Sequence, residues 1–126
     1  MPRRSPRRPL RTLAAALALL ALAADAGAHA LLVEAIPSDS SRLTAAPSQL
    51  VLRFNSRIEH GLSGATLLGE AGMRRALPVD ADAPPDRLVA PFPALGPGTY
   101  TVEWQVLSVD GHRAAGRLGF TIVGPG

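Results

Sequence analysis

Residues 99–108, TYTVEWQVLS, alternate between apolar and polar side chains over most of their length. The apolar members are Tyr100, Val102, Trp104 and Val106. Successive side chains of an extended chain point to opposite faces, so this pattern predicts a strand with one buried face. It is the clearest strand signal in the chain, and the strands expected around it define the fold.

Shorter runs of the same kind lie on both sides of this strand, and residues 50–54 and 117–122 show the same alternation. The predicted strands are 29–36, 50–54, 64–69, 74–79, 87–90, 99–108 and 117–122. Turn-forming residues separate them: 70–73 predicts a hairpin turn, 80–86 a loop, and 91–98 a turn without ladder pairing. Seven short strands in one domain predict an all-β fold, an Ig-like antiparallel Greek-key sandwich or barrel.

The first 28 residues have the three parts of a signal peptide. Five arginines precede residue 12, residues 13–24 are an apolar run, and Ala26-Gly27-Ala28 offers small residues at a cleavage site. The run is shorter than the ~20 residues that a membrane-spanning helix needs. We therefore expect residues 1–28 to be cleaved and 29–126 to be exported to the periplasm without stable membrane insertion. Export follows the general secretory route or, given SPRRPL at 5–10, the twin-arginine route.

Cleavage changes what the composition implies. The full chain of 126 residues has a pI of about 11.0, which suggests a nucleic-acid ligand. The mature chain keeps eight arginines against nine acidic residues, a net charge of −1, so we expect no nucleic-acid partner. The chain has no cysteine, which excludes disulfides and thiolate ligands. Any chemistry must come from histidines, carboxylates and backbone groups.

Cleavage after Ala28 makes His29 the first residue of the mature chain. That residue then offers an α-amine and an imidazole, which can close a chelate ring on one metal ion. The alternative is that His29 follows the cleavage site by chance.

A second candidate is Asp110-Gly111-His112, between the two clearest strands. Residues two apart on an extended segment project to one side, and Gly111 permits the backbone geometry that would let both point at one spot. Taken alone, these residues are explained better by an ordinary Asp-Gly hairpin turn. Taken with His29, they make a set of three nitrogens and one oxygen, which favours tetragonal Cu(II) over Cu(I). We interpret Met73 as a hydrophobic residue and His60 as a surface residue.

Several stretches together resemble the CopC family of periplasmic copper-resistance proteins. They are His29-Ala30, PSDS at 37–40, LVLRFN at 50–55, LSGA at 62–65, PGTYTVEW at 97–104, SVDGH at 108–112 and GFT at 119–121. The resemblance implies a seven-stranded Greek-key β-fold that holds one Cu(II) per chain. Carried over to this sequence, its metal ligands are His29, Asp110 and His112.

Two features depart from the family pattern. Some members hold Cu(I) in a methionine-rich loop, and here Met73 is the only methionine of the mature chain. Some members carry a carboxylate two residues after the phenylalanine of 50–54, where this chain has Ser56. Glu59 or His60 could substitute, but no geometric reason favours either.

We therefore expect a monomeric, non-enzymatic Cu(II) carrier that serves copper homeostasis and exchanges copper with a CopD-like inner-membrane copper transport protein. One alternative is a copper monooxygenase-like enzyme, because an N-terminal histidine chelate is also the active-site device of lytic polysaccharide monooxygenases. The second alternative is a metal-free β-sandwich that acts as an interaction module.

Overall fold

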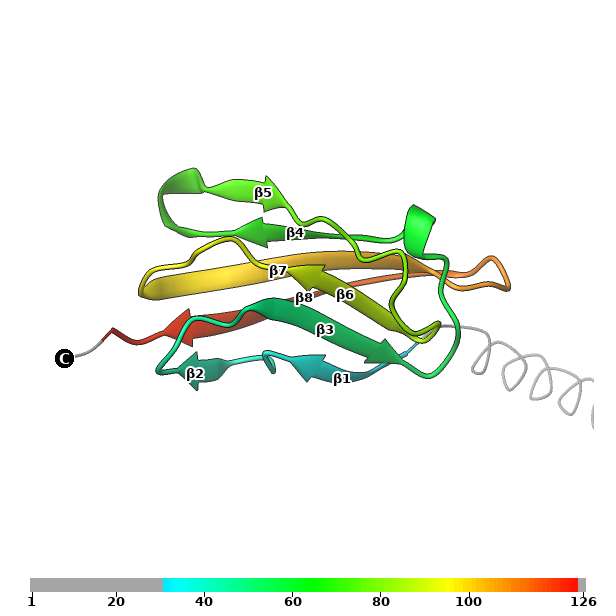
Figure 1. The fold of residues 1–126 in the computed structure, drawn as a ribbon, viewed down its shortest axis with the longest axis horizontal. Helices are drawn as coiled ribbons and strands as arrows, with labels where there is room; N and C mark the ends of the chain where they lie inside the picture. Colours follow the sequence, from blue (N-terminus) through cyan, green and yellow to red (C-terminus); the bar gives the residue numbers. More distant parts are fainter. Residues whose placement is uncertain (1–30, 125–126) are drawn as a thin grey trace, which may run out of the picture.

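The computed structural model describes residues 31–124. Its strands are β1 (Leu32–Ile36), β2 (Ser41–Leu43), β3 (Gln49–Phe54), β4 (Gly64–Leu68), β5 (Arg74–Ala76), β6 (Arg87–Pro91), β7 (Gly98–Leu107) and β8 (Arg113–Ile122). Two single-turn 3₁₀ helices, η1 (His60–Leu62) and η2 (Glu70–Gly72), flank β4. One sheet has the order β1-β3-β6 and the other β2-β8-β7-β4-β5, and the two lie face to face (Figure 1).

The predicted all-β sandwich is confirmed, with two differences in detail. The described residues form eight strands rather than seven, because Ser41–Leu43 adds a short strand that no alternation in the sequence indicates. This strand, β2, pairs with β8 in parallel, whereas every other strand pair is antiparallel. The parallel pair arises because the chain crosses from one sheet to the other after β1 without reversing its direction (Figure 1).

The predicted strand boundaries hold best where alternation is strongest. The hairpin around 70–73 joins β4 and β5 as expected, and 80–86 is a loop. The expectation that 91–98 makes no ladder pairs is wrong at both ends, since Pro91 pairs with Gln49 and Gly98 with Ile122. A proline is tolerated there because it ends β6, an edge strand, where its missing N–H breaks no ladder bond. The first two residues of the predicted strand 29–36 lie outside the described residues.

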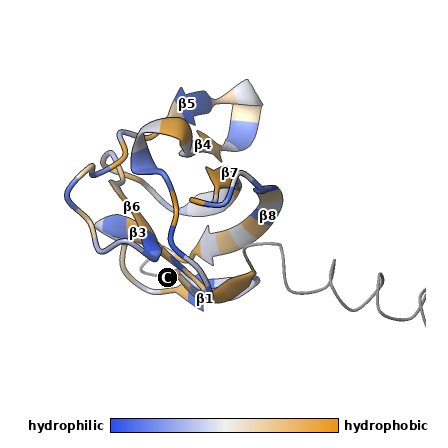
Figure 2. Cartoon of the chain, turned by 90° about the vertical axis from the view of Figure 1, so that its right-hand side faces the viewer, coloured by the Kyte–Doolittle hydropathy of each residue, from blue (hydrophilic) through white to orange (hydrophobic). Residues whose placement is uncertain are grey.

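The core lies between the two sheets. The four apolar residues predicted to share one face of β7 are all buried, as are Leu118, Phe120 and Ile122 of β8. Phe54 of β3 meets Trp104 of β7 edge to face, with ring centroids 5.3 Å apart. Figure 2, which looks along the strands, shows orange, hydrophobic bands alternating with paler ones on β8. The core lies between the sheets, and loops that connect the strands lie at both ends of the sandwich (Figure 1).

Within residues 31–124, no helix is long and apolar enough to cross a membrane.

Candidate metal site

The β7–β8 hairpin ends in a loop of five residues, 108–112, that presents Asp110. The N–H of Ser108 donates to the carbonyl of His112 at 2.8 Å, which closes the loop, and the N–H of Gly111 donates to the carbonyl of Ser108 at 2.9 Å. Gly111 has φ of 92°, a left-handed conformation that glycine adopts without a steric penalty. The glycine therefore lets the chain turn between Asp110 and His112 and keeps both side chains at the hairpin tip.

Three groups surround one oxygen of the Asp110 carboxylate. Oδ1 accepts hydrogen bonds from the Ser108 hydroxyl and from the N–H of His112, the latter at 3.2 Å. Nδ1 of the His112 ring lies 3.2 Å from the same oxygen. The Ser108 hydroxyl first, and then His112, stabilise the charged form and lower the pKa of Asp110 to about 2. The carboxylate is therefore ionised at neutral pH and is held in one orientation.

Backbone hydrogen bonds tie this hairpin to the loop that follows β3. The N–H of Val109 donates to the carbonyl of Arg57 at 3.1 Å, and the N–H of Glu59 donates to the carbonyl of Leu107 at 2.8 Å. Ile58 and Ser108 form an isolated bridge between these two bonds. Since β3 and β7 belong to different sheets, both sheets hold the hairpin at this end of the sandwich, on the right in Figure 1.

The start of the described chain reaches the same loop. The N–H of Leu31 donates to Oδ1 of Asn55 at 2.7 Å, and the N–H of Asn55 donates to the carbonyl of Leu31 at 3.0 Å. His29, the first of the three predicted ligands, lies outside the described residues. The structure brings the other two, Asp110 and His112, together. Residues 31–124 alone contain no group of three or more His, Asp or Glu side chains that could hold a metal ion.

The side chain of His60, interpreted from the sequence as a surface residue, is only partly exposed. Its ring is half-buried, and Nε2 lies 2.8 Å from the carbonyl oxygen of Arg87 and 3.1 Å from that of Pro84. It therefore joins η1 to the loop before β6, a contact between distant segments that the sequence does not indicate.

Met73 and Ser56 are two further positions that the sequence left open. Met73 is partly buried and packs against the hydrophobic core, as expected of a hydrophobic residue. The Ser56 hydroxyl is buried and makes no hydrogen bond within the described part of the chain.

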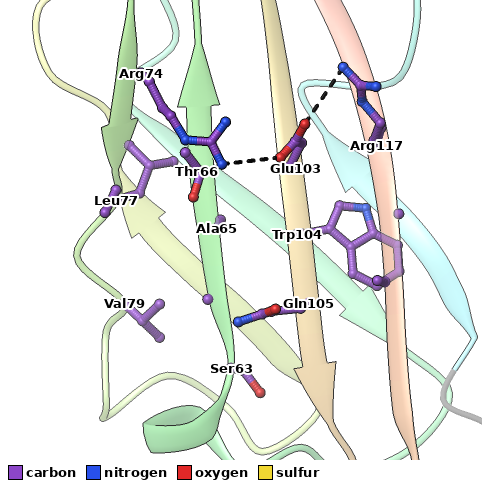
Figure 3. A pocket seen from close by; sticks show the side chains of 14 residues that line it. Ser63, Ala65, Thr66, Arg74, Leu77, Val79, Glu103, Trp104, Gln105 and Arg117 are labelled. Carbon is purple, nitrogen blue, oxygen red and sulfur yellow. Dashed lines mark ion pairs between the residues drawn. The ribbon is translucent and has the colours of Figure 1, made fainter.

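A hollow of about 760 Å³ is lined by residues of β4, β5, β7 and β8 (Figure 3). Its only carboxylate, Glu103, lies between two guanidinium groups, 3.6 Å from Arg74 and 3.7 Å from Arg117. A carboxylate that is already paired with two cations, without a histidine beside it, makes a poor metal site.

The chain is similar to known proteins by family model, by sequence and by structure. The family model for the CopC domain matches residues 32–123. Protein YobA of Escherichia coli K12 is 38% identical over 98 residues, which cover 75% of this chain and 79% of YobA. Copper resistance protein C of Xanthomonas campestris pv. juglandis is 34% identical over 107 residues, 79% of this chain and 84% of that protein. The crystal structure of CopC from Methylosinus trichosporium OB3b matches with a TM-score of 0.70 at 32% identity, over 78% of this chain and 97% of that one.

Proposed function

This chain belongs to the CopC family of copper resistance proteins, and on that basis we propose that its mature form binds one Cu(II) ion at the end of the sandwich where β7 meets β8. The ligands in this proposal are the α-amine and imidazole of His29, the carboxylate of Asp110 and the imidazole of His112. The observation that carries it is that the Asp110–His112 loop and Leu31, the residue before β1, are both tied to the loop after β3.

Chain connectivity supports the inclusion of His29. Leu31 is anchored to Asn55, and two residues span at most about 7 Å, so an N-terminal His29 stays within reach of this end of the molecule. An amine, two imidazoles and a carboxylate suit tetragonal Cu(II). The Asp110 carboxylate is ionised at neutral pH, so Cu(II) has no proton to displace from it.

We further propose that the protein is a carrier rather than an enzyme. Residues 1–28 are removed on export, the mature monomer works in the periplasm, and a CopD-like inner-membrane copper transport protein exchanges copper with it. Within residues 31–124, four of the five aromatic side chains are buried and Phe92 is half-buried. This arrangement supports the carrier over a polysaccharide monooxygenase, which would need aromatic rings on its surface to hold the substrate.

The test is a Cu(II) titration of mature protein that begins at His29, followed by electron paramagnetic resonance (EPR). We expect one equivalent bound, a tetragonal type 2 spectrum with nitrogen hyperfine structure, and weaker binding of Cu(I). One extra residue before His29 should weaken binding strongly, since it converts the amine into an amide. His60→Gln is the control and should bind as the wild type does. Equal affinity for the extended and native N-termini would contradict the proposed ligand set.

A further inference from the structure

We propose that Asn55 is a positioning residue for the metal site: its side chain fixes the start of the mature chain so that the N-terminal amine and imidazole meet the Asp110–His112 hairpin. This inference rests on the proposed Cu(II) site and assigns to Asn55 a role that its residue type and place in the sequence do not suggest.

The geometry of Asn55 differs from that of an ordinary ladder residue. β1 and β3 are antiparallel with Leu32 opposite Phe54, so the next pair in register is Leu31 with Asn55. The N–H of Asn55 donates to the carbonyl of Leu31, as a ladder residue would. The second hydrogen bond of this residue pair is different, because the N–H of Leu31 donates to the side-chain oxygen Oδ1 of Asn55. The side-chain amide therefore replaces the backbone carbonyl in the ladder.

This replacement lets the backbone turn away after Asn55 while the ladder with β1 stays closed. Two residues later, the carbonyl of Arg57 accepts the N–H of Val109 in the β7–β8 loop. The chain leaves β3 at Asn55. The Asn55 side chain keeps Leu31 in place, and the residues that follow Asn55 hold the hairpin. The short segment from Asn55 to Glu59 therefore contacts both halves of the proposed site.

A terminal ligand needs this kind of anchor because free chain ends fray. With Leu31 fixed, only residues 29 and 30 must be ordered when the metal binds. Without the Asn55 acceptor, Leu31 would have to be ordered as well, and ordering the backbone of one more residue weakens binding about tenfold. The neighbouring Ser56 offers a matched control, since its hydroxyl has no hydrogen-bond partner within the described residues.

The experiment measures Cu(II) affinity at pH 7 by competition with a chelator, using protein that begins at His29. We expect Asn55→Ala and Asn55→Leu, which lack the acceptor, to bind about tenfold more weakly than the wild type, with altered nitrogen hyperfine structure. Asn55→Asp keeps an oxygen for Leu31 and should bind at least as tightly as the wild type. Ser56→Ala should be unchanged. Amide hydrogen exchange at Leu31 should accelerate in the Ala and Leu variants, and thermal unfolding confirms that each variant is folded.

The affinities of Asn55→Ala and the wild type are compared again in protein that carries one extra glycine before His29. This second comparison distinguishes a positioning role of Asn55 from a general loss of stability. In that background the chelate is already dismantled, so Asn55→Ala should cause no further loss of affinity. An equal loss in both backgrounds, or an equal loss in Ser56→Ala, would overturn the positioning role. Wild-type affinity in Asn55→Ala would overturn it as well, and the proposed function would stand. Absence of nitrogen-coordinated Cu(II) in the wild type would instead refute the proposed function, and the role of Asn55 with it.

Discussion

Replacement of Ser108 by alanine tests the arrangement around the Asp110 carboxylate directly. The hydroxyl of Ser108, a residue only 2% exposed, is the largest single cause of the low pKa of Asp110, which is lowered from an ordinary value of 3.8 to about 2. Ser108→Ala removes this donor and leaves both contacts from His112 in place. We expect the pKa of Asp110 to rise to a value between about 2 and 3.8, because a weaker set of donors stabilises the carboxylate less.

The assay is a carbon NMR titration of the Asp110 carboxyl group in metal-free protein. A carboxyl whose pKa is lowered by folding stabilises the folded state above its unfolded pKa, and this contribution is lost as the pH falls from 3.8 toward about 2. The difference in thermal midpoint between wild type and Ser108→Ala should therefore be largest above pH 5 and shrink toward pH 2. A wild-type titration midpoint near 3.8, or one that Ser108→Ala leaves in place, would refute the assigned hydrogen bond.

Three further predictions concern the core, the loop contacts and the effect of protons on the metal. Gly116→Ala places a Cβ within 2.7 Å of Cε2 of the Trp104 indole and should lower the free energy of unfolding by about 1 to 3 kcal/mol in a denaturant titration. Gly119→Ala on the same strand meets nothing nearer than 3.6 Å and serves as its control. His60→Ala removes a ring that reaches two loop carbonyls and should lower the free energy of unfolding by about 1 kcal/mol, with Cu(II) affinity unchanged. The apparent Cu(II) affinity should fall more than about 100-fold between pH 7 and pH 5 in a non-coordinating buffer, because the amine and imidazole ligands become protonated; equal affinity at both pH values would exclude nitrogen ligands.

The fold could be predicted from the sequence wherever large apolar residues alternate. β7 shows this pattern because every second side chain enters the core. The first half of β8 does not show it, since Gly116 lies under the Trp104 indole and a large side chain there would have no room. β8 begins at Arg113, four residues before the alternation that predicted a strand over 117–122. β2 is too short to show alternation, and its parallel pairing with β8 depends on how the chain crosses between the sheets.

The candidate site, like the fold, could be predicted only in part from the sequence. Asp110 and His112 could be predicted because their spacing on one local turn is a property of neighbouring residues. The Asn55–Leu31 and His60–Arg87 contacts join segments 24 and 27 residues apart, and they depend on where the loops after β3 and before β6 lie once the sheets have packed. No short motif encodes such contacts, so these two side chains were not assigned their structural roles from the sequence.

The exposure of Asp110 and His112, the two proposed ligands that the structure describes, bears on the role that the proposed copper site suits. The side chains of His112 and Asp110 are 44% and 56% exposed, at the tip of a hairpin rather than inside the core. A ligand group of a second protein can approach such a tip while the first ligands are still bound, so the metal could pass through a mixed coordination sphere without being released to water. A site enclosed by the core would instead require the sandwich to open. The position of the proposed ligands Asp110 and His112 at a loop tip, held in place by hydrogen bonds to both sheets, therefore supports the carrier role that we propose over long-term storage of the metal.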